Sequence, residues 1–267
     1  MALRKVRLLD QEPVPDGTKP VQVLCLGMCR TGTTSLLETL TQLGYTPIHM
    51  QHIIENTDRK RLWIEAIEST FIDQKPYGRA EFDILLQGFD ATLDIPAAIF
   101  AEQLVKAYPE AKVILTTRSV DSWIRSMNNT VWQHFRWPSY RILSYIEPEF
   151  MGTIIKLLDL IFYVHSKNKY DGPEAEQAFL AHNQRVREMV PAKNLLELSP
   201  PFDMEKLCGF LDKPLPSSSY PHVNNKEEFI QKVINRRNKS MGFALRRLGK
   251  TSLMLVPILG LLWYIWV

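Results

Sequence analysis

The segment from Val21 to Ser35 constrains the fold of this chain more than any other stretch. Its first six residues, Val-Gln-Val-Leu-Cys-Leu, are mostly apolar and predict a buried strand. Gly27 and Gly32 bracket a short turn, and the Thr-Thr-Ser that follows predicts the start of a helix. A strand, a glycine turn and a helix N-terminus aim backbone N–H groups at one point, which is how proteins hold phosphate. The segment therefore predicts a phosphate-binding loop.

This loop lacks the lysine that nucleotide hydrolases use. The spacing from Gly27 to Gly32 fits their G-x-x-x-x-G-K-[ST] loop, in which the lysine reaches the β- and γ-phosphates. Thr33 stands in the lysine position here, and the nearest cation is Arg30, two residues before the second glycine. We therefore expect a loop that cradles a 5′-phosphate. A magnesium-dependent kinase or NTPase is the alternative, and Thr33 argues against it.

A second strand, turn and helix carries another cation and hydroxyl. Residues 112–117 have a strand pattern that leads to Arg118, and Ser119 is a suitable N-cap for the following helix. Ser126 lies eight positions after Arg118 on that helix. Arginine supplies a fork of donors for phosphate, and a hydroxyl near a helix N-terminus adds a bond beside the helix dipole. The pair predicts a second phosphate site, with a surface arginine and a polar helix face as the alternative.

Taken together, these two elements resemble those of the sulfotransferases. Many members have Lys-Ser-Gly-Thr in the first loop, where Arg30 takes the lysine position, and an Arg and a Ser placed like Arg118 and Ser126. The resemblance covers roughly residues 21–230 and is closest to a fungal branch that is often labelled NAD-dependent epimerase or dehydratase. It is carried further by Trp63–Ala66, Pro76–Asp83, Asp94–Ala97, Phe100–Leu104, Tyr108–Lys112, Arg187–Pro191, Leu207–Leu211 and Pro221–Asn224. No G-x-G-x-x-G follows the first strand, so the epimerase label has no support in the residues.

The resemblance implies transfer of a sulfuryl group from 3′-phosphoadenosine 5′-phosphosulfate to a hydroxyl or amine of a small acceptor, without a metal. It implies that the donor is held by Arg30, Thr31, Gly32, Thr33, Thr34, Ser35, Arg118 and Ser126. A general base must also reach the acceptor proton. His49 is the first candidate and Asp94 the second, with a structural histidine and a helix-capping aspartate as the alternatives. The predicted catalytic residues are thus Arg30, His49 and Asp94.

Strand and helix patterns alternate through the first half of the chain. Strands are predicted at 21–26, 45–50, 89–93, 112–117 and 195–198. Helices are predicted at 33–43, 55–72, 80–86, 97–107, 119–135, 139–166, 174–189, 203–211 and 226–234. This alternation predicts an α/β P-loop nucleotide-binding fold, with a central parallel sheet flanked by helices and the ligand at the carboxyl ends of the strands. A C-terminal hydrophobic helix is expected in addition.

The basic charge of the chain is concentrated in one short segment. The formal net charge is +3, but residues 236–250 contain six basic and no acidic side chains, so residues 1–235 carry a net charge of −3. A nucleic-acid-binding domain would spread positive charge over a folded face, so no nucleic-acid partner is expected. Residues 253–267 are apolar throughout. Basic residues beside an apolar segment are typical of the cytosolic flank of a membrane helix.

These patterns predict four parts of the chain. They are an irregular lead-in at 1–20, a sulfotransferase-like domain at 21–235, a basic juxtamembrane segment at 236–250 and a membrane anchor at 251–267. At about 1.5 Å per residue the anchor would span about 25 Å, which is short for a transmembrane helix. We expect a single-pass membrane protein with its domain in the cytosol. The alternative is a hydrophobic helix that docks on the domain or lies flat on a membrane.

The sequence says least about the acceptor. Aromatic side chains that are candidates to line an apolar acceptor pocket are Trp132, Phe135, Trp137, Tyr140 and Tyr145. Aromatic residues are more often part of a core, which is the alternative for this group. A membrane anchor would suit a lipophilic acceptor. The alternative from another class of protein is a catalytically silent P-loop protein that binds nucleotide and is tethered to a membrane. The sequence makes no prediction of oligomeric state.

Overall fold

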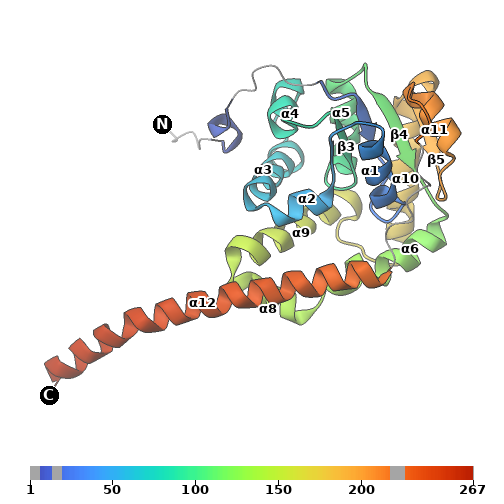
Figure 1. Cartoon of the computed structure of the whole chain (residues 1–267). Coiled ribbons are helices and arrows are strands. Elements are labelled where there is room, and N and C mark those ends of the chain that lie inside the picture. The colour runs from blue at the N-terminus through green and yellow to red at the C-terminus, as the bar shows by residue number, and fades with distance from the viewer. Residues whose placement is uncertain (1–6, 14–19, 217–225, 267) are drawn as a thin grey trace.

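The computed structural model describes residues 7–13, 20–216 and 226–266, of which residues 226, 248 and 250–266 are described by their backbone alone. Five parallel strands form one sheet in the order β2-β3-β1-β4-β5 (Figure 1). They are β1 (Val23–Cys25), β2 (Pro47–Ile48), β3 (Ala91–Leu93), β4 (Lys112–Thr116) and β5 (Leu195–Leu198). The predicted α/β fold with a central parallel sheet is confirmed.

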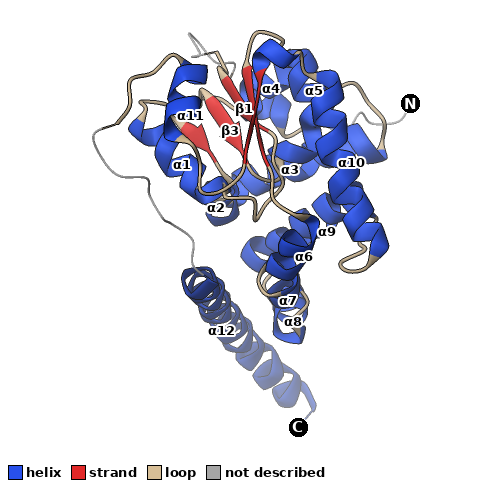
Figure 2. Cartoon of the chain, turned by 90° about the vertical axis from the view of Figure 1, so that its right-hand side faces the viewer, coloured by secondary structure: helices blue, strands red, loops and turns tan. Residues whose placement is uncertain are grey.

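Helices cover both faces of the sheet (Figure 2). Alternate residues of β1 belong to two separate cores. Val23 and Cys25 pack with α1 (Thr33–Gln42) and α11 (Met204–Leu211). Leu24 contributes to the larger core on the opposite face. The helices of that core include α3 (Thr57–Ile67), α4 (Arg79–Leu85), α5 (Ala101–Ala107), α6 (Val120–Asn128), α9 (Thr153–Ser166) and α10 (Pro173–Met189). A strand that is buried on both faces explains the continuous apolar pattern of β1.

The order of the strands gathers the candidate residues at one edge of the sheet. β1 is central, because it pairs with β3 on one side and with β4 on the other. All strands are parallel, so the loops that follow β1, β2, β3 and β4 leave from the same end. These loops begin with or contain Arg30, His49, Asp94 and Arg118. The four side chains therefore lie where ligands bind in open α/β sheets.

Two helices that the sequence predicted as continuous are divided in the structure. The predicted helix at 119–135 is α6 followed by α7 (Val131–Phe135), because Asn129 and Thr130 between them are poor helix formers. The predicted helix at 139–166 is α8 (Pro138–Ile146), a π-helical turn and α9. Pro148 opens that turn and lacks the N–H that would continue α8. Short 3₁₀ and π turns occur at Leu9–Gln11, Glu68–Ile72, Ala97–Phe100, Pro148–Gly152 and Ala192–Asn194.

The C-terminal helix is much longer than expected. α12 runs from Lys226 to Trp266, packs against α8 and then extends away from the body of the domain (Figure 1). The prediction of a short helix at 226–234 is therefore wrong. The predicted boundaries at residues 235 and 250 both fall inside α12, and the division into four parts stays a prediction.

The predicted membrane anchor involves residues whose side chains lie outside the described part of the chain. Within the part that is described, no helix is long and apolar enough to cross a membrane. The anchor at 251–267 and the membrane localisation stay predictions. The lead-in at 1–20 is described only in part, and there Leu9 is buried within a short 3₁₀ helix.

Gly27 marks the closest approach of the loop after β1 to β4, and its replacement by Ala should destabilise the fold. A Cβ atom at Gly27 would lie 2.5 Å from the carbonyl oxygen of Thr116 and closer still to its Oγ1. We expect Gly27→Ala to lower the free energy of unfolding by about 1–3 kcal/mol, the usual cost of overpacking. Urea denaturation followed by circular dichroism measures this change.

Gly209→Ala is the matched control for this substitution. Gly209 lies in α11, where an added Cβ atom would meet no described atom within 4 Å. Ala is the better helix former, so this variant should keep or raise the free energy of unfolding, by up to about 1 kcal/mol. Equal denaturation midpoints for Gly27→Ala and the parent protein would contradict the close packing of this loop.

Candidate active site

The loop after β1 is held in shape by hydrogen bonds from its own residues and from two neighbouring elements. Thr31 Oγ1 donates to the Met28 carbonyl at 2.6 Å and lies 2.6 Å from Thr116 Oγ1 on β4. Trp123 on α6 donates its Nε1 proton to the Cys29 carbonyl at 2.9 Å. Gly32 has a φ of +99° and turns the chain into α1, which begins at Thr33. The N–H of Thr33 has no intrahelical acceptor, so this helix start suits an anion.

Two arginines and a serine meet beside the loop. Arg30 Nε donates to Ser126 Oγ at 3.1 Å. Arg118 donates from Nη1 to the Arg30 carbonyl at 2.9 Å and from Nη2 to Ser122 Oγ. The two phosphate-binding elements predicted from separate parts of the sequence are thus brought to one place. Arg30, Arg118 and Ser126 all take part in these contacts.

Neither guanidinium forms an ion pair with a carboxylate among the residues that the structure describes. Burial lowers the pKa of Arg30 from its ordinary value, and burial together with Arg30 and Arg125 lowers that of Arg118. Partly buried cations without an anionic partner cost free energy, and an anionic ligand would remove that cost. The arrangement therefore fits a ligand that carries more than one phosphate group.

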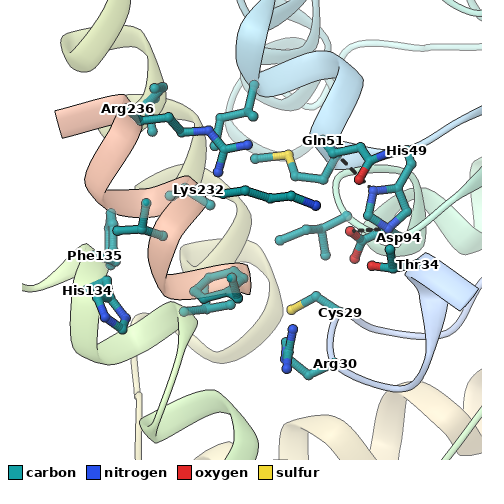
Figure 3. A pocket seen from close by; sticks show the side chains of 18 of the residues that line it. Cys29, Arg30, Thr34, His49, Gln51, Asp94, His134, Phe135, Lys232 and Arg236 are labelled. Carbon is teal, nitrogen blue, oxygen red and sulfur yellow. Dashed lines mark hydrogen bonds and ion pairs between the residues drawn. The ribbon is translucent and has the colours of Figure 1, made fainter. Parts of the chain in front are cut away.

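His49 and Asp94 contact each other next to the start of α1. His49 Nε2 is 3.0 Å from Asp94 Oδ2 and 3.1 Å from Thr33 Oγ1. His49 Nδ1 accepts the N–H of Gln51 at 3.1 Å, which makes His49 the N-cap of α2 (Met50–Glu55) (Figure 3). Because Nδ1 is an acceptor, this pattern assigns the proton of the neutral ring to Nε2. His49 therefore donates a hydrogen bond to Asp94.

Asp94 has the properties of a proton acceptor. Its side chain is buried, and its Oδ1 atom has no hydrogen-bond partner among the described residues. Burial, opposed in part by the Ile95 N–H and by Arg30, raises the pKa of Asp94 to about 7. Burial, with His52 and Lys232 nearby, holds the pKa of His49 well below its ordinary value. Asp94 also has a φ of +70°, and such backbone strain in non-glycine residues clusters at functional sites.

A cavity of about 130 Å³ joins the loop to the helices below the sheet. Its polar wall is formed by Cys29, Arg30, Thr33, Thr34, His49, Gln51 and Asp94. Its apolar wall comes from α2, α7, α8, α9 and α12 and includes Ile54, Val131, Phe135, Tyr140, Ile154, Leu158, Phe229 and Val233. The cavity thus has a polar end, with hydroxyl groups, one carboxyl group and one guanidinium, and an end lined mainly by apolar side chains. Within the described residues, no group of three or more His, Cys, Asp and Glu side chains is arranged to hold a metal ion.

Of the five aromatic residues that the sequence offered as acceptor contacts, two line this cavity. They are Phe135 and Tyr140. Trp132 is fully buried in the core, and Tyr145 has 85% of its surface exposed. Trp137 packs against the ring of His134 at a centroid distance of 4.4 Å and does not line the cavity.

The contribution of α12 to the site was not predicted from the sequence. This helix adds Phe229, Lys232, Val233 and Arg236 to the cavity wall (Figure 3). It is held in place by Arg236 Nε, 2.7 Å from Glu55 Oε1, and by the Tyr140 hydroxyl, which donates to the Val233 carbonyl at 2.7 Å. The guanidinium of Arg30 also lies 5.2 Å from the centre of the Phe229 ring. No local motif marks these α12 residues, because their partners lie far away in the sequence.

Comparisons with known proteins agree with this geometry. Residues 22–229 match the sulfotransferase domain family. The chain is also 39% identical over 209 residues to the Ava biosynthesis cluster protein M of Aspergillus versicolor, an alignment that covers 76% of this chain and 80% of that protein. The chain therefore belongs to the sulfotransferase family, a family of transferases, and the resemblance inferred from the sequence is confirmed.

The raised pKa of Asp94 predicts how the stability of the protein depends on pH. The pKa of Asp94 rises from an ordinary value of 3.8 to about 7 in the folded state. Between these values the folded state binds more protons than the unfolded state, so this group costs stability as the pH rises, by up to about 1.4 kcal/mol per pH unit. Asn does not titrate. We therefore expect the stability of Asp94→Asn relative to the parent protein to increase from about pH 4 to about pH 7 and to level off above.

Urea denaturation of both proteins across this pH range measures the difference. A difference in unfolding free energy that stays constant between the two proteins at every pH would contradict the raised pKa. Comparison with the parent protein at each pH cancels the contributions of the titrating groups that do not contact Asp94, which include His165 and His182.

Proposed function

We propose that the protein transfers a sulfuryl group from 3′-phosphoadenosine 5′-phosphosulfate to a hydroxyl or amine of a small acceptor. The observation that carries this proposal is the meeting of two phosphate-binding elements, in which Arg30 contacts Ser126 and Arg118 contacts the backbone of Arg30. Membership of the sulfotransferase family supports the reaction class. The choice of donor and the nature of the acceptor are part of the proposal.

The donor carries phosphate groups at two positions, and the site offers a separate set of residues for each. We infer that the 5′-phosphate is held by Thr31, Gly32, Thr33, Thr34 and Ser35, and the 3′-phosphate by Arg118 and Ser126. When bound, the donor supplies a sulfuryl group activated as a mixed anhydride with phosphate. Arg30 lies between the two sets and neutralises the charge that develops on the leaving phosphate. Its bond to Ser126 would be exchanged for bonds to the ligand.

Asp94 is the residue best suited to take the proton from the acceptor. Its Oδ1 atom is buried and unpartnered among the described residues, and its raised pKa suits a base that works near neutral pH. As the acceptor oxygen or nitrogen takes up the sulfuryl group, its proton passes to Asp94. His49 uses Nδ1 to cap α2 and donates from Nε2 to Asp94, so it orients the carboxylate. This reverses the order of the two candidates expected from the sequence.

A magnesium-dependent kinase or ATPase is the alternative reaction, and the loop argues against it. Thr33 occupies the lysine position, and its Oγ1 atom lies 3.1 Å from His49 Nε2.

Membrane attachment is a further part of the proposal. Membrane attachment through residues 251–267 is supported by their apolar sequence and by the basic segment before them. Such attachment would favour a lipophilic acceptor.

Calorimetric titration with adenosine 3′,5′-bisphosphate tests the donor site. We expect the parent protein to prefer this ligand over adenosine 5′-monophosphate and over ATP with magnesium. Arg118→Ala should weaken bisphosphate binding by about 10- to 100-fold, because a charge-assisted hydrogen bond is worth about 1.5–3 kcal/mol. The same variant should bind the monophosphate as the parent does. Arg185→Ala, an exposed arginine on α10, is the control and should leave both affinities unchanged.

Failure of the parent protein to distinguish the bisphosphate from the monophosphate would argue against the proposed donor. Equal bisphosphate affinity in Arg118→Ala and the parent would remove Arg118 from the 3′-phosphate site.

The assignment of Asp94 is tested by turnover with an acceptor found by screening. Asp94→Asn should lower kcat by about 10²- to 10⁴-fold, the usual contribution of a general base, while bisphosphate affinity stays the same. His49→Gln should lower kcat less, because the carboxylate remains and only its orientation is loosened. A larger loss in His49→Gln than in Asp94→Asn would show that the histidine is the base.

A further inference from the structure

α12 places an exposed lysine in the wall of the cavity, and the proposed reaction leaves it unused. Lys232 lies in the cavity wall, and its side chain extends from α12 towards His49 and Asp94 (Figure 3). Its positive charge also contributes to the lowered pKa of His49, which places it within electrostatic range of that ring. The residue lies beyond the segment 22–229 that matches the sulfotransferase domain family.

Lys232 differs from the other basic side chains that α12 places near the cavity. Arg236 and Lys239 both pair with Glu55, at 2.7 Å and 3.1 Å, and thereby hold α12 against the end of α2. Among the residues that the structure describes, no carboxylate lies within ion-pair distance of Lys232. Its ammonium group is therefore available to a ligand in the cavity.

The volume and the apolar wall of the cavity indicate a ligand with an apolar part of about one ring. A buried apolar cavity of about 150 Å³ is known to hold benzene, so a cavity of about 130 Å³ has room for roughly one ring. Phe135, Leu158 and Val233 offer the ring apolar contacts. Gln51 also lines the cavity but carries no charge.

Charge identifies the group that faces Lys232. A phosphorylated donor bound at Arg30 and Arg118, together with the carboxyl group of Asp94, would make the polar end of the cavity unfavourable for a second anion, so an anionic group of the acceptor has to lie beside Lys232 instead. Lys232 is placed to offset this repulsion from the side of the cavity that α12 forms. We propose that the acceptor is a small hydroxy acid of about one ring, whose carboxylate pairs with Lys232 while its hydroxyl faces Asp94. This assignment rests on the proposed function, both for the charge of the donor and for the role of the hydroxyl.

A matched pair of ring compounds tests the proposal by binding alone. The probes are para-(hydroxymethyl)benzoate and para-(hydroxymethyl)benzamide, which share the ring and the hydroxyl and differ in charge. Calorimetry is carried out on the full chain, with and without adenosine 3′,5′-bisphosphate. We expect the acid to bind about tenfold more tightly than the amide, the scale of one charge-assisted hydrogen bond. Lys232→Met should remove this preference and Lys232→Arg should keep it.

Lys193→Met is the control, because Lys193 is exposed and precedes the amino end of β5, away from the cavity. It removes the same charge and should keep the preference for the acid. Equal binding of the two probes to the parent protein, no binding of either, or a preference that survives in Lys232→Met would each overturn the proposal. Lysine-dependent binding of the acid without any binding of the bisphosphate would overturn the proposed donor and leave the acid site standing.

Discussion

The site depends on the close packing of the loop after β1 against the end of β4. Gly27 lies so near to Thr116 that a methyl group would collide with it, and Thr31 in the same loop contacts the Thr116 hydroxyl. Arg118 follows Thr116 by two residues, so this contact also sets where the second phosphate-binding element begins. Two motifs that are weak when read separately become one site because a central parallel strand and its neighbour end side by side.

Several charged and polar groups at this site are at least partly buried and lack either an ion-pairing or a hydrogen-bonding partner among the described residues. Arg30 and Arg118 are partly buried without a carboxylate partner among the described residues, and Asp94 has an oxygen that is buried without a hydrogen bond. Each arrangement costs free energy of folding, which the two apolar cores on either side of the sheet offset. Unpartnered buried groups of this kind are common at sites where a ligand supplies the missing partner. Here the two arginines indicate an anionic ligand group, and the free oxygen of Asp94 indicates a group that donates a proton.

The parts of this structure that could be predicted are those that short stretches of sequence specify. Gly27, Gly32 and Arg118 lie in strand–turn–helix patterns, in which a continuous apolar run leads into a helix, so the loops and their position at the sheet edge followed from the sequence. The contact of His49 with Asp94 and the docking of Arg236 on Glu55 could not be predicted. The second of these joins residues 181 positions apart, and no local pattern records it. The breaks within two predicted helices were missed because apolar periodicity continues across them, whereas Pro148 interrupts the backbone.

α2 connects the two halves of the site. Its N-cap is His49, whose ring accepts the Gln51 N–H and contacts Asp94. Its last residue is Glu55, which forms ion pairs with Arg236 and Lys239 of α12. This helix of six residues therefore links the contact with Asp94 at its start to the contacts with α12 at its end. The loops at the edge of the sheet thus supply the groups proposed to bind phosphate, whereas α12 both forms a wall of the cavity and contacts the end of the helix that His49 caps. Members of the family that share the loops but differ in this C-terminal segment should accordingly bind similar donors and select different acceptors.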